Sequence, residues 1–152
     1  MPLPTRIGIQ FDVYSGNDDP NDQTLGTFNP LYPRLKYFGE SGAYSPFNLI
    51  DLRPGMLFTL AKKHRLSLSH DSLWRYNTDD ALYGPNGIVL RSGNASDARH
   101  IGGKYEASLL SLWTPGLATQ ATFAHLPAGD FIKQSGPSAS IDLFMFEAFW
   151  KF

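Results

Sequence analysis

The sequence has no cysteine, few charged residues and no long apolar run. Without cysteine, disulfide bonds and thiolate metal sites are excluded. Charged residues make up 18% of the chain, which is below the roughly 25% of an average soluble protein. The net charge of -1 provides no general attraction for nucleic acid. No stretch approaches the roughly 20 apolar residues of a membrane-spanning helix, and no export signal follows Met1.

The hydrophobic pattern repeats at every second residue, which is the period of a β-strand rather than of a helix. In Thr5–Tyr14, for example, Ile7, Ile9 and Phe11 lie on one face and Gln10 lies on the other. The chain is also rich in turn-forming residues, with 14 Gly and 11 Pro. We expect strands over six segments: Thr5–Tyr14, Phe47–Ala61, Arg65–Asn77, Ile101–Trp113, Leu117–His125 and Ile141–Phe152.

The connections between these segments alternate in length. Two are short, at 62–64 and 114–116, and three are long and polar: Ser15–Pro46, Thr78–His100 and Leu126–Ser140. Outer-membrane barrels join their strands in this way, with short periplasmic turns and long extracellular loops. We therefore predict an all-β fold, an antiparallel up-and-down transmembrane β-barrel segment that spans 1–152 as a single domain in the bacterial outer membrane.

The alternation itself does not show which face meets water. A soluble β-domain buries its apolar face, whereas a membrane barrel turns that face to lipid and lines its lumen with the polar face. The aromatic residues favour the barrel, because Trp74 and Trp150 lie near segment ends, where the interfacial girdles of such barrels lie. The alternative is a soluble carbohydrate-binding β-module, with Tyr32, Tyr37 and Tyr83 stacking on sugars.

The last strand and several loop motifs resemble those of a known family. The chain ends at Phe152 after alternating aromatic and apolar residues, as the terminal strands of outer-membrane barrels do. The loop motifs are similar to those of the alginate export family of outer-membrane channels, and together they cover most of the chain. In family order they are Gly26–Arg34, Lys36–Gly39, Leu73–Asp80, Leu82–Gly84, Leu90–Gly93, Ala98–Gly102 and Ala128–Ile132.

This resemblance implies a porin-like channel whose arginine-rich lumen passes an anionic, alginate-like polysaccharide or a related acidic solute. It also implies that the outer wall contacts membrane lipid and that the barrel-assembly machinery binds the strand ending at Phe152. About six strands match only the C-terminal part of such a barrel, and single-chain barrels have at least about eight. Because an open sheet leaves unpaired edges in lipid, we expect a fragment of a longer barrel, a truncated gene model or an assembly of several copies.

Fixed positive charge along the lumen would guide a polyanion, and arginine suits this role because it stays charged and binds carboxylates at two points. Interspersed acids would keep the attraction weak enough for transit. Arg75 is the favoured candidate, because it lies in a matched motif and on the polar face. Alternatively, these charges simply neutralise one another in a wet lumen. The predicted pore-lining residues are Arg6, Arg53, Arg65, Arg75, Lys104, Asp51, Asp71 and Glu106 on the strands, and Arg91 and Arg99 in the second long loop.

No enzyme, metal or cofactor site is predicted. His70 and Ser72 lie close in sequence, but a lipase-like site needs a third group that orients the histidine. Asp18, Asp19 and Asp22 do not have the spacing of a calcium-binding EF-hand loop. The four histidines show no spacing typical of metal ligands.

Overall fold

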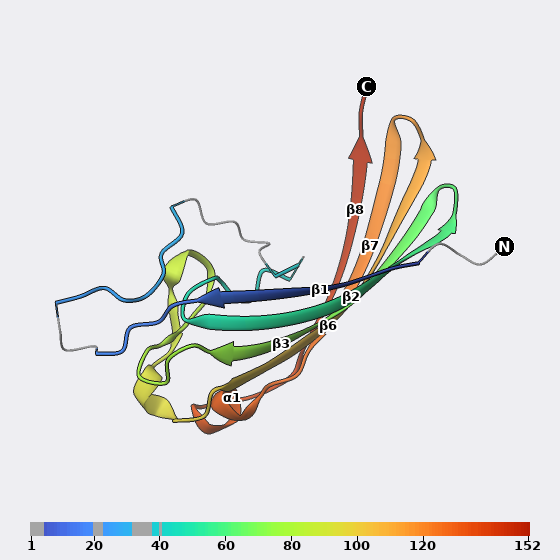
Figure 1. The fold of residues 1–152 in the computed structure, drawn as a ribbon. Coiled ribbons are helices and arrows are strands. Elements are labelled where there is room, and N and C mark those ends of the chain that lie inside the picture. The colour runs from blue at the N-terminus through green and yellow to red at the C-terminus, as the bar shows by residue number, and fades with distance from the viewer. Residues whose placement is uncertain (1–4, 20–22, 32–37, 40) are drawn as a thin grey trace.

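The computed structural model describes residues 5–19, 23–31, 38–39 and 41–152 (Figure 1). Two of the proposed sugar-stacking residues, Tyr32 and Tyr37, lie outside the described residues, as does Asp22. Among the residues that the structure describes, no helix has both the length and the apolar character needed to cross a membrane.

Six antiparallel strands form one sheet, in which each strand pairs with its neighbours in the sequence. The strands are β1 (Thr5–Tyr14), β2 (Leu49–Ala61), β3 (His64–Arg75), β6 (His100–Thr114), β7 (Leu117–Leu126) and β8 (Ile141–Trp150). The predicted all-β, up-and-down fold is confirmed, with strand ends that differ from the predicted ones by one or a few residues. The sheet is open in this structure, with β1 and β8 at its two edges.

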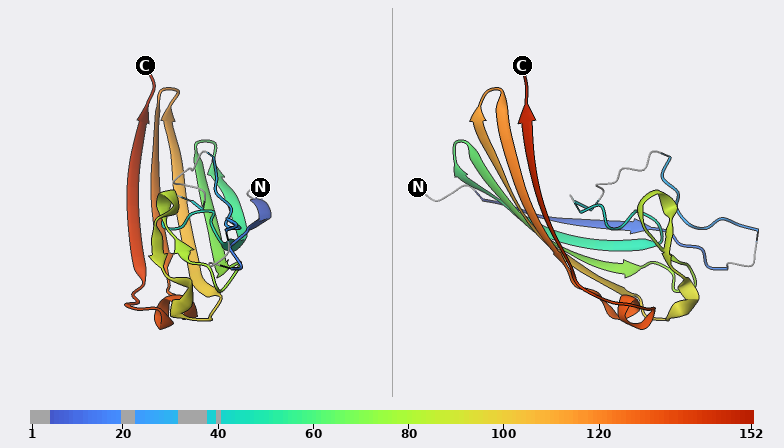
Figure 2. Two further views of the ribbon diagram at one scale, coloured as in Figure 1. Left: turned by 90° about the vertical axis from the view of Figure 1, so that its left-hand side faces the viewer. Right: turned by 180° about the vertical axis from the view of Figure 1, so that it is seen from behind.

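The short turns gather at one end of the sheet and the long connections at the other (Figures 1 and 2). The hairpin turns after β2 and β6 lie together with Phe152 at the short-turn end. The long connections contain short elements of their own: β4 (Leu82–Tyr83), η1 (Pro85–Gly87), β5 (Val89–Arg91), η2 (Gly93–Ala95) and α1 (Asp130–Gln134). The predicted difference between the two ends is therefore present in three dimensions.

The strand register separates the side chains into an apolar face and a polar face. On the apolar face, Ile7 pairs with Met56 across β1 and β2, and Phe123 pairs with Phe144 across β7 and β8. This face is exposed: Ile7 keeps 74% of its surface accessible and Phe144 keeps 70%. Because a soluble β-domain buries its apolar face, the exposure pattern here is the reverse of a soluble one.

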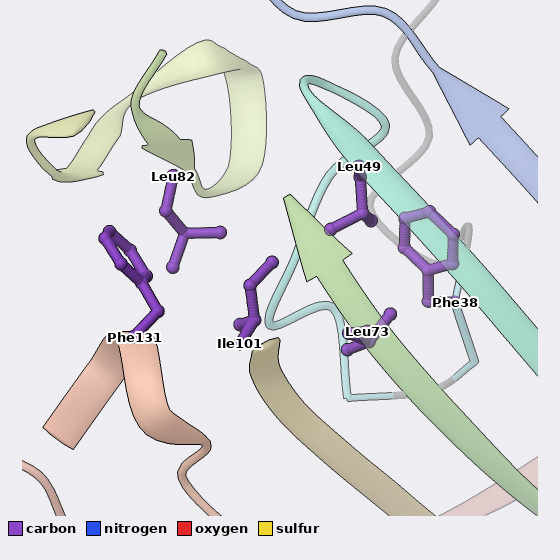
Figure 3. Packing of buried hydrophobic residues seen from close by; sticks show 6 residues of the cluster. All are labelled: Phe38, Leu49, Leu73, Leu82, Ile101 and Phe131. Atoms are coloured by element: carbon purple, nitrogen blue, oxygen red, sulfur yellow. The ribbon is translucent and has the colours of Figure 1, made fainter. Parts of the chain in front are cut away.

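A small hydrophobic core lies at the loop end, between the sheet and the long connections (Figure 3). Its buried members come from the loops as well as from the strands: Phe38, Leu49, Leu73, Leu82, Ile101 and Phe131. Gly102 permits this packing, because its φ of +147° suits glycine and a Cβ atom there would collide with the carbonyl oxygen of Pro127. The backbone N–H of Gly129 donates to the Ile101 carbonyl at 2.7 Å. These contacts fix the loops on the sheet.

Candidate pore-lining site

Charged side chains from three adjacent strands meet on the polar face. Alternation places Arg53 of β2, Asp71 of β3 and Lys104 of β6 on this face, and the register pairs Asp71 directly with Lys104. The Arg53 Nε lies 3.6 Å from Asp71 Oδ1, and Arg53 Nη2 lies 3.6 Å from Glu106 Oε1. Lys104 Nζ lies 3.3 Å from Asp71 Oδ2 and 3.2 Å from Glu106 Oε2. We refer to Asp51, Arg53, Asp71, Lys104 and Glu106 as the ion cluster.

The ion cluster also binds the connection between β1 and β2. Lys104 is 2% exposed, and its ammonium donates to the backbone carbonyl of Phe38 as well as to Glu106. Gly39 follows with a φ of +93°, and a Cβ atom there would collide with the Lys104 ammonium. An ammonium has three donors, and its contacts with Phe38, Asp71 and Glu106 account for all of them. This part of the loop therefore lies over the polar face.

The ion cluster does not have the excess of positive charge that was predicted for the lumen. Its three carboxylates, Asp51, Asp71 and Glu106, outnumber its two cations, so its formal charge is -1. Asp51 is fully buried opposite Asp12 of β1, and neither of its carboxylate oxygens has a hydrogen-bond partner within the described part of the chain. At this level of the sheet the charges chiefly pair with one another.

Arg75 lies on the polar face, as the alternation predicts, but it is not exposed there. It was the favoured pore-lining residue, but its side chain is fully buried at the loop end. Its guanidinium carbon lies 3.8 Å from the centre of the Phe131 ring, which is a cation–π contact. Its N–H groups donate to the carbonyls of Thr78, Asp80, Gly93, Ser96 and Ala98. Arg75 therefore holds the loops together and has no free donor for a solute.

Arg6 and Arg65 lie on the polar face nearer the short turns. Arg6 pairs with Leu57 and Arg65 pairs with Thr59, so the two arginines flank β2. These four residues line a cavity of about 250 Å³. Both arginines are exposed, and neither has a hydrogen bond or ion pair within the ranges that the structure describes. They are the cations on this face that remain able to bind a solute.

The two loop arginines lie in the β3–β6 connection, as predicted. Arg91, in β5, donates to the Leu90 carbonyl at 2.9 Å and to the Pro137 carbonyl at 3.1 Å. Arg99 is exposed immediately before β6. No ion pair joins either residue to the ion cluster in the described ranges.

Two residues that the sequence did not single out connect the loops. Asp80 accepts hydrogen bonds from Thr27 at 2.6 Å and from Tyr83 at 2.7 Å, and thus joins the first two long loops. Burial and this bond to Asp80 raise the pKa of Tyr83 to about 12. Asn48, at a φ of +50°, uses its side-chain amide to bond the backbone of Asn77 and Ala81. Polar loop residues are common, and no spacing distinguishes these two.

The structure also places the two residues that were considered for a lipase-like site, His70 and Ser72. Ser72 Oγ lies 3.0 Å from His70 Nε2 on the apolar face, and the His70 ring stacks on Tyr105. His70 Nδ1, where a third catalytic group would bind, has no hydrogen-bond partner among the described residues. In the same residues, no three His, Cys, Asp or Glu side chains form a group that could hold a metal ion.

Comparison with known proteins identifies the family of this chain. The model of a protein family described as alginate export matches residues 1–146, which is nearly the whole chain. No curated protein matches the sequence.

Proposed function

The chain belongs to the alginate export family, and from this premise we propose that its sheet forms part of the wall of an outer-membrane channel. In this proposal, an anionic, alginate-like polysaccharide passes along the polar face and membrane lipid covers the apolar face. No chemical step is involved, because moving a polymer along a water-filled path makes and breaks no covalent bond.

The observation that carries the proposal is the reversed exposure of the two faces. Apolar side chains are accessible on every strand of the sheet, and Trp150 keeps 76% of its surface exposed. In contrast, Asp71 and Lys104 of the polar face are almost fully covered. Exposing so much apolar surface to water would cost roughly 25 cal/mol for each Å². A lipid environment removes this cost and explains the reversal.

The length of the apolar face also agrees with a bilayer. Trp113 lies on that face at one end of β6, and Tyr105 lies on the same face nearer the middle of the strand. At a rise of roughly 3.3 Å per residue, the distance between them along the strand is about 27 Å. The usual strand tilt of about 40° reduces this to a height of about 20 Å, close to the apolar band of roughly 25 Å in outer-membrane barrels. Aromatic side chains at both limits suit the two interfaces.

We propose that Arg6 and Arg65 bind the carboxylates of the moving polymer. Both are exposed and unpaired within the described ranges, so they keep their donors for a solute. Lys104 and Arg53 are paired with acids of the ion cluster and contribute little free positive charge. A few arginines in contact with water attract a polyanion without holding it too tightly for transit.

Two further partners belong to the proposal. Membrane lipid covers the apolar face, and the barrel-assembly machinery binds the last strand, which ends before Phe152 with an alternation of exposed aromatic residues. Because an open edge is not tolerated in lipid, the β1 and β8 edges must be paired in the working channel.

Ion selectivity in a planar bilayer tests the proposed path. We expect an assembled channel containing Arg6→Glu and Arg65→Glu to lose its preference for anions, with the reversal potential moving toward cation selectivity. The matched control reverses two cations in the turn after β2, Lys62→Glu and Lys63→Glu, which changes the net charge equally but leaves the polar face intact. Unchanged anion selectivity in the Arg6 and Arg65 variant would contradict the proposed path.

A further inference from the structure

A cavity of about 320 Å³ lies where the three long connections meet, at the loop end of the polar face. Its walls come from the segment before β2, from the β4–β5 ribbon, from the β7–β8 connection and from the loop-side ends of β7 and β8. The lining residues are Ala43, Tyr44, Leu82, Leu90, Arg91, Leu126, Ala128, Ile132, Pro137, Ala139 and Ile141. Side chains of this cavity, which we call the loop pocket, have no part in the ion cluster or in the Arg6–Arg65 path.

The floor of the loop pocket is firmly held. Leu82 is a buried member of the hydrophobic core (Figure 3), and Ile132 packs against that core. Leu126 is also buried and pairs in register with Ile141. A pocket built on packed side chains keeps its shape without a ligand, which lowers the entropic cost of binding one.

Two polar groups of the loop pocket lack partners. Arg91 uses one Nη N–H toward Leu90 and one toward Pro137, which leaves two Nη N–H groups without an acceptor among the described residues. Its Nε is enclosed by protein and has no acceptor there either. The Tyr44 hydroxyl likewise has no partner in those ranges, and burial raises the pKa of Tyr44, which keeps this hydroxyl protonated. A carboxylate in the pocket would accept hydrogen bonds from the remaining Nη N–H groups of Arg91 and from the Tyr44 hydroxyl, and its charge would pair with the guanidinium.

The remaining lining residues indicate the chemical class of the part of the ligand that lies away from Arg91. Apart from Arg91 and Tyr44, every lining residue is aliphatic or proline. A sugar ring carries hydroxyl groups around its rim, and burying them against leucine and isoleucine without hydrogen bonds is unfavourable. A hydrocarbon chain has no such requirement and gains from the burial. We propose that the loop pocket binds a small aliphatic carboxylic acid, with its carboxylate on Arg91 and Tyr44 and its chain among the aliphatic side chains.

Binding of octanoate to the assembled protein in detergent tests this site, measured by equilibrium dialysis against detergent alone. We expect saturable binding, which Ala139→Phe abolishes by filling the pocket. Ala43→Phe, at a lining residue from the segment before β2, serves the same purpose if the first variant does not fold. Arg91→Gln should weaken octanoate binding roughly tenfold or more, because a charge-assisted hydrogen bond is lost. The same substitution should weaken the binding of octan-1-ol much less, because octan-1-ol has no charge.

Lys62→Gln is the matched control, because it removes an exposed cation in the turn after β2, far from the loop pocket, and should leave octanoate binding unchanged. Equal binding by the wild type and both filled variants would overturn the proposal, since the signal would then come from the surface or the micelle. Competition by uronate oligomers at lower concentrations than octanoate would also overturn it, because the pocket would then be a sugar site. The channel need not conduct for this measurement, so its outcome is independent of the proposed path.

Discussion

The two faces of the sheet differ in what covers them. On the apolar face, large side chains such as Ile9 and Phe146 are exposed, and no loop of the described chain is seen to pack over them. On the polar face, the first long loop reaches across to Lys104, and charged groups are paired beneath it. This difference supports the proposal that lipid covers the apolar face and that water lies along the polar face.

The polar face is itself divided into two halves. Toward the loops, Arg75 and Lys104 have their donors engaged by carbonyls and carboxylates. Toward the short turns, Arg6 and Arg65 have none engaged within the described ranges. Arginine therefore holds the loops together at one end of this face and stays exposed at the other. The difference follows from loop coverage, because the carbonyl partners of Arg75 and Lys104 lie in the long connections.

Substitutions at two adjacent residues of β6 test whether the two faces of the sheet meet different media, and they have the largest expected effect. Leu109→Arg places a charge on the apolar face midway between Tyr105 and Trp113, and we expect it to cost about 2–4 kcal/mol of folding free energy in vesicles. Ser108→Arg, on the polar face, should cost about 1 kcal/mol or less. Denaturant titration of the chain in lipid vesicles measures both. Equal costs would mean that the two faces meet the same medium.

Exchanging arginine for lysine tests whether the two halves of the polar face use their arginines differently. We expect Arg75→Lys to destabilise the loops by about 2 kcal/mol, because lysine has fewer donors and cannot reach five carbonyls with a rigid fork. Arg65→Lys should leave stability nearly unchanged. The rate of limited proteolysis in the β3–β6 connection reports the difference. If both variants are cleaved at the wild-type rate, Arg75 does not hold the loops.

The smallest expected effect concerns Tyr83 at the loop end. Its pKa is raised to about 12 by burial and by the bond to Asp80, whereas an unfolded tyrosine titrates near its ordinary value of 10.0. The neutral phenol therefore stabilises the folded loops below about pH 10, and this contribution is lost as the pH rises toward 12. Absorbance at alkaline pH should show a late-titrating tyrosine that disappears in Tyr83→Phe. A titration that is the same in both proteins would contradict this contact.

The period of two was sufficient to predict the strands, and the alternating lengths of the connections were sufficient to predict the up-and-down order and the difference between the two ends. It also placed Arg53, Asp71 and Lys104 on one face, because the side-chain period of a strand is fixed. The fate of Arg75 could not be predicted in this way. Its position on the polar face is correct by alternation, but whether it meets water depends on how the β3–β6 connection folds over it, and that depends on contacts distant in sequence.

Asp80 and Asn48 were missed for the same reason. Their importance comes from partners up to 63 residues away, as in the bond from the Asn17 backbone to Asp80, and no local pattern contains that information. Likewise, the excess of acids in the ion cluster becomes visible only when the register of three strands is known. Alternation predicts the face of a residue, whereas the loops decide its exposure.

The orientation of the sheet is the central claim, and spin labels along β6 test it most directly. Because the chain has no cysteine, single substitutions Ala107→Cys, Ser108→Cys, Leu109→Cys and Leu110→Cys each provide one labelling site in the channel assembled in vesicles. We predict that labels at 107 and 109 collide mainly with oxygen dissolved in lipid, and that labels at 108 and 110 collide mainly with a water-soluble nickel complex. The opposite alternation, or equal access of the nickel complex to all four labels, would contradict the account.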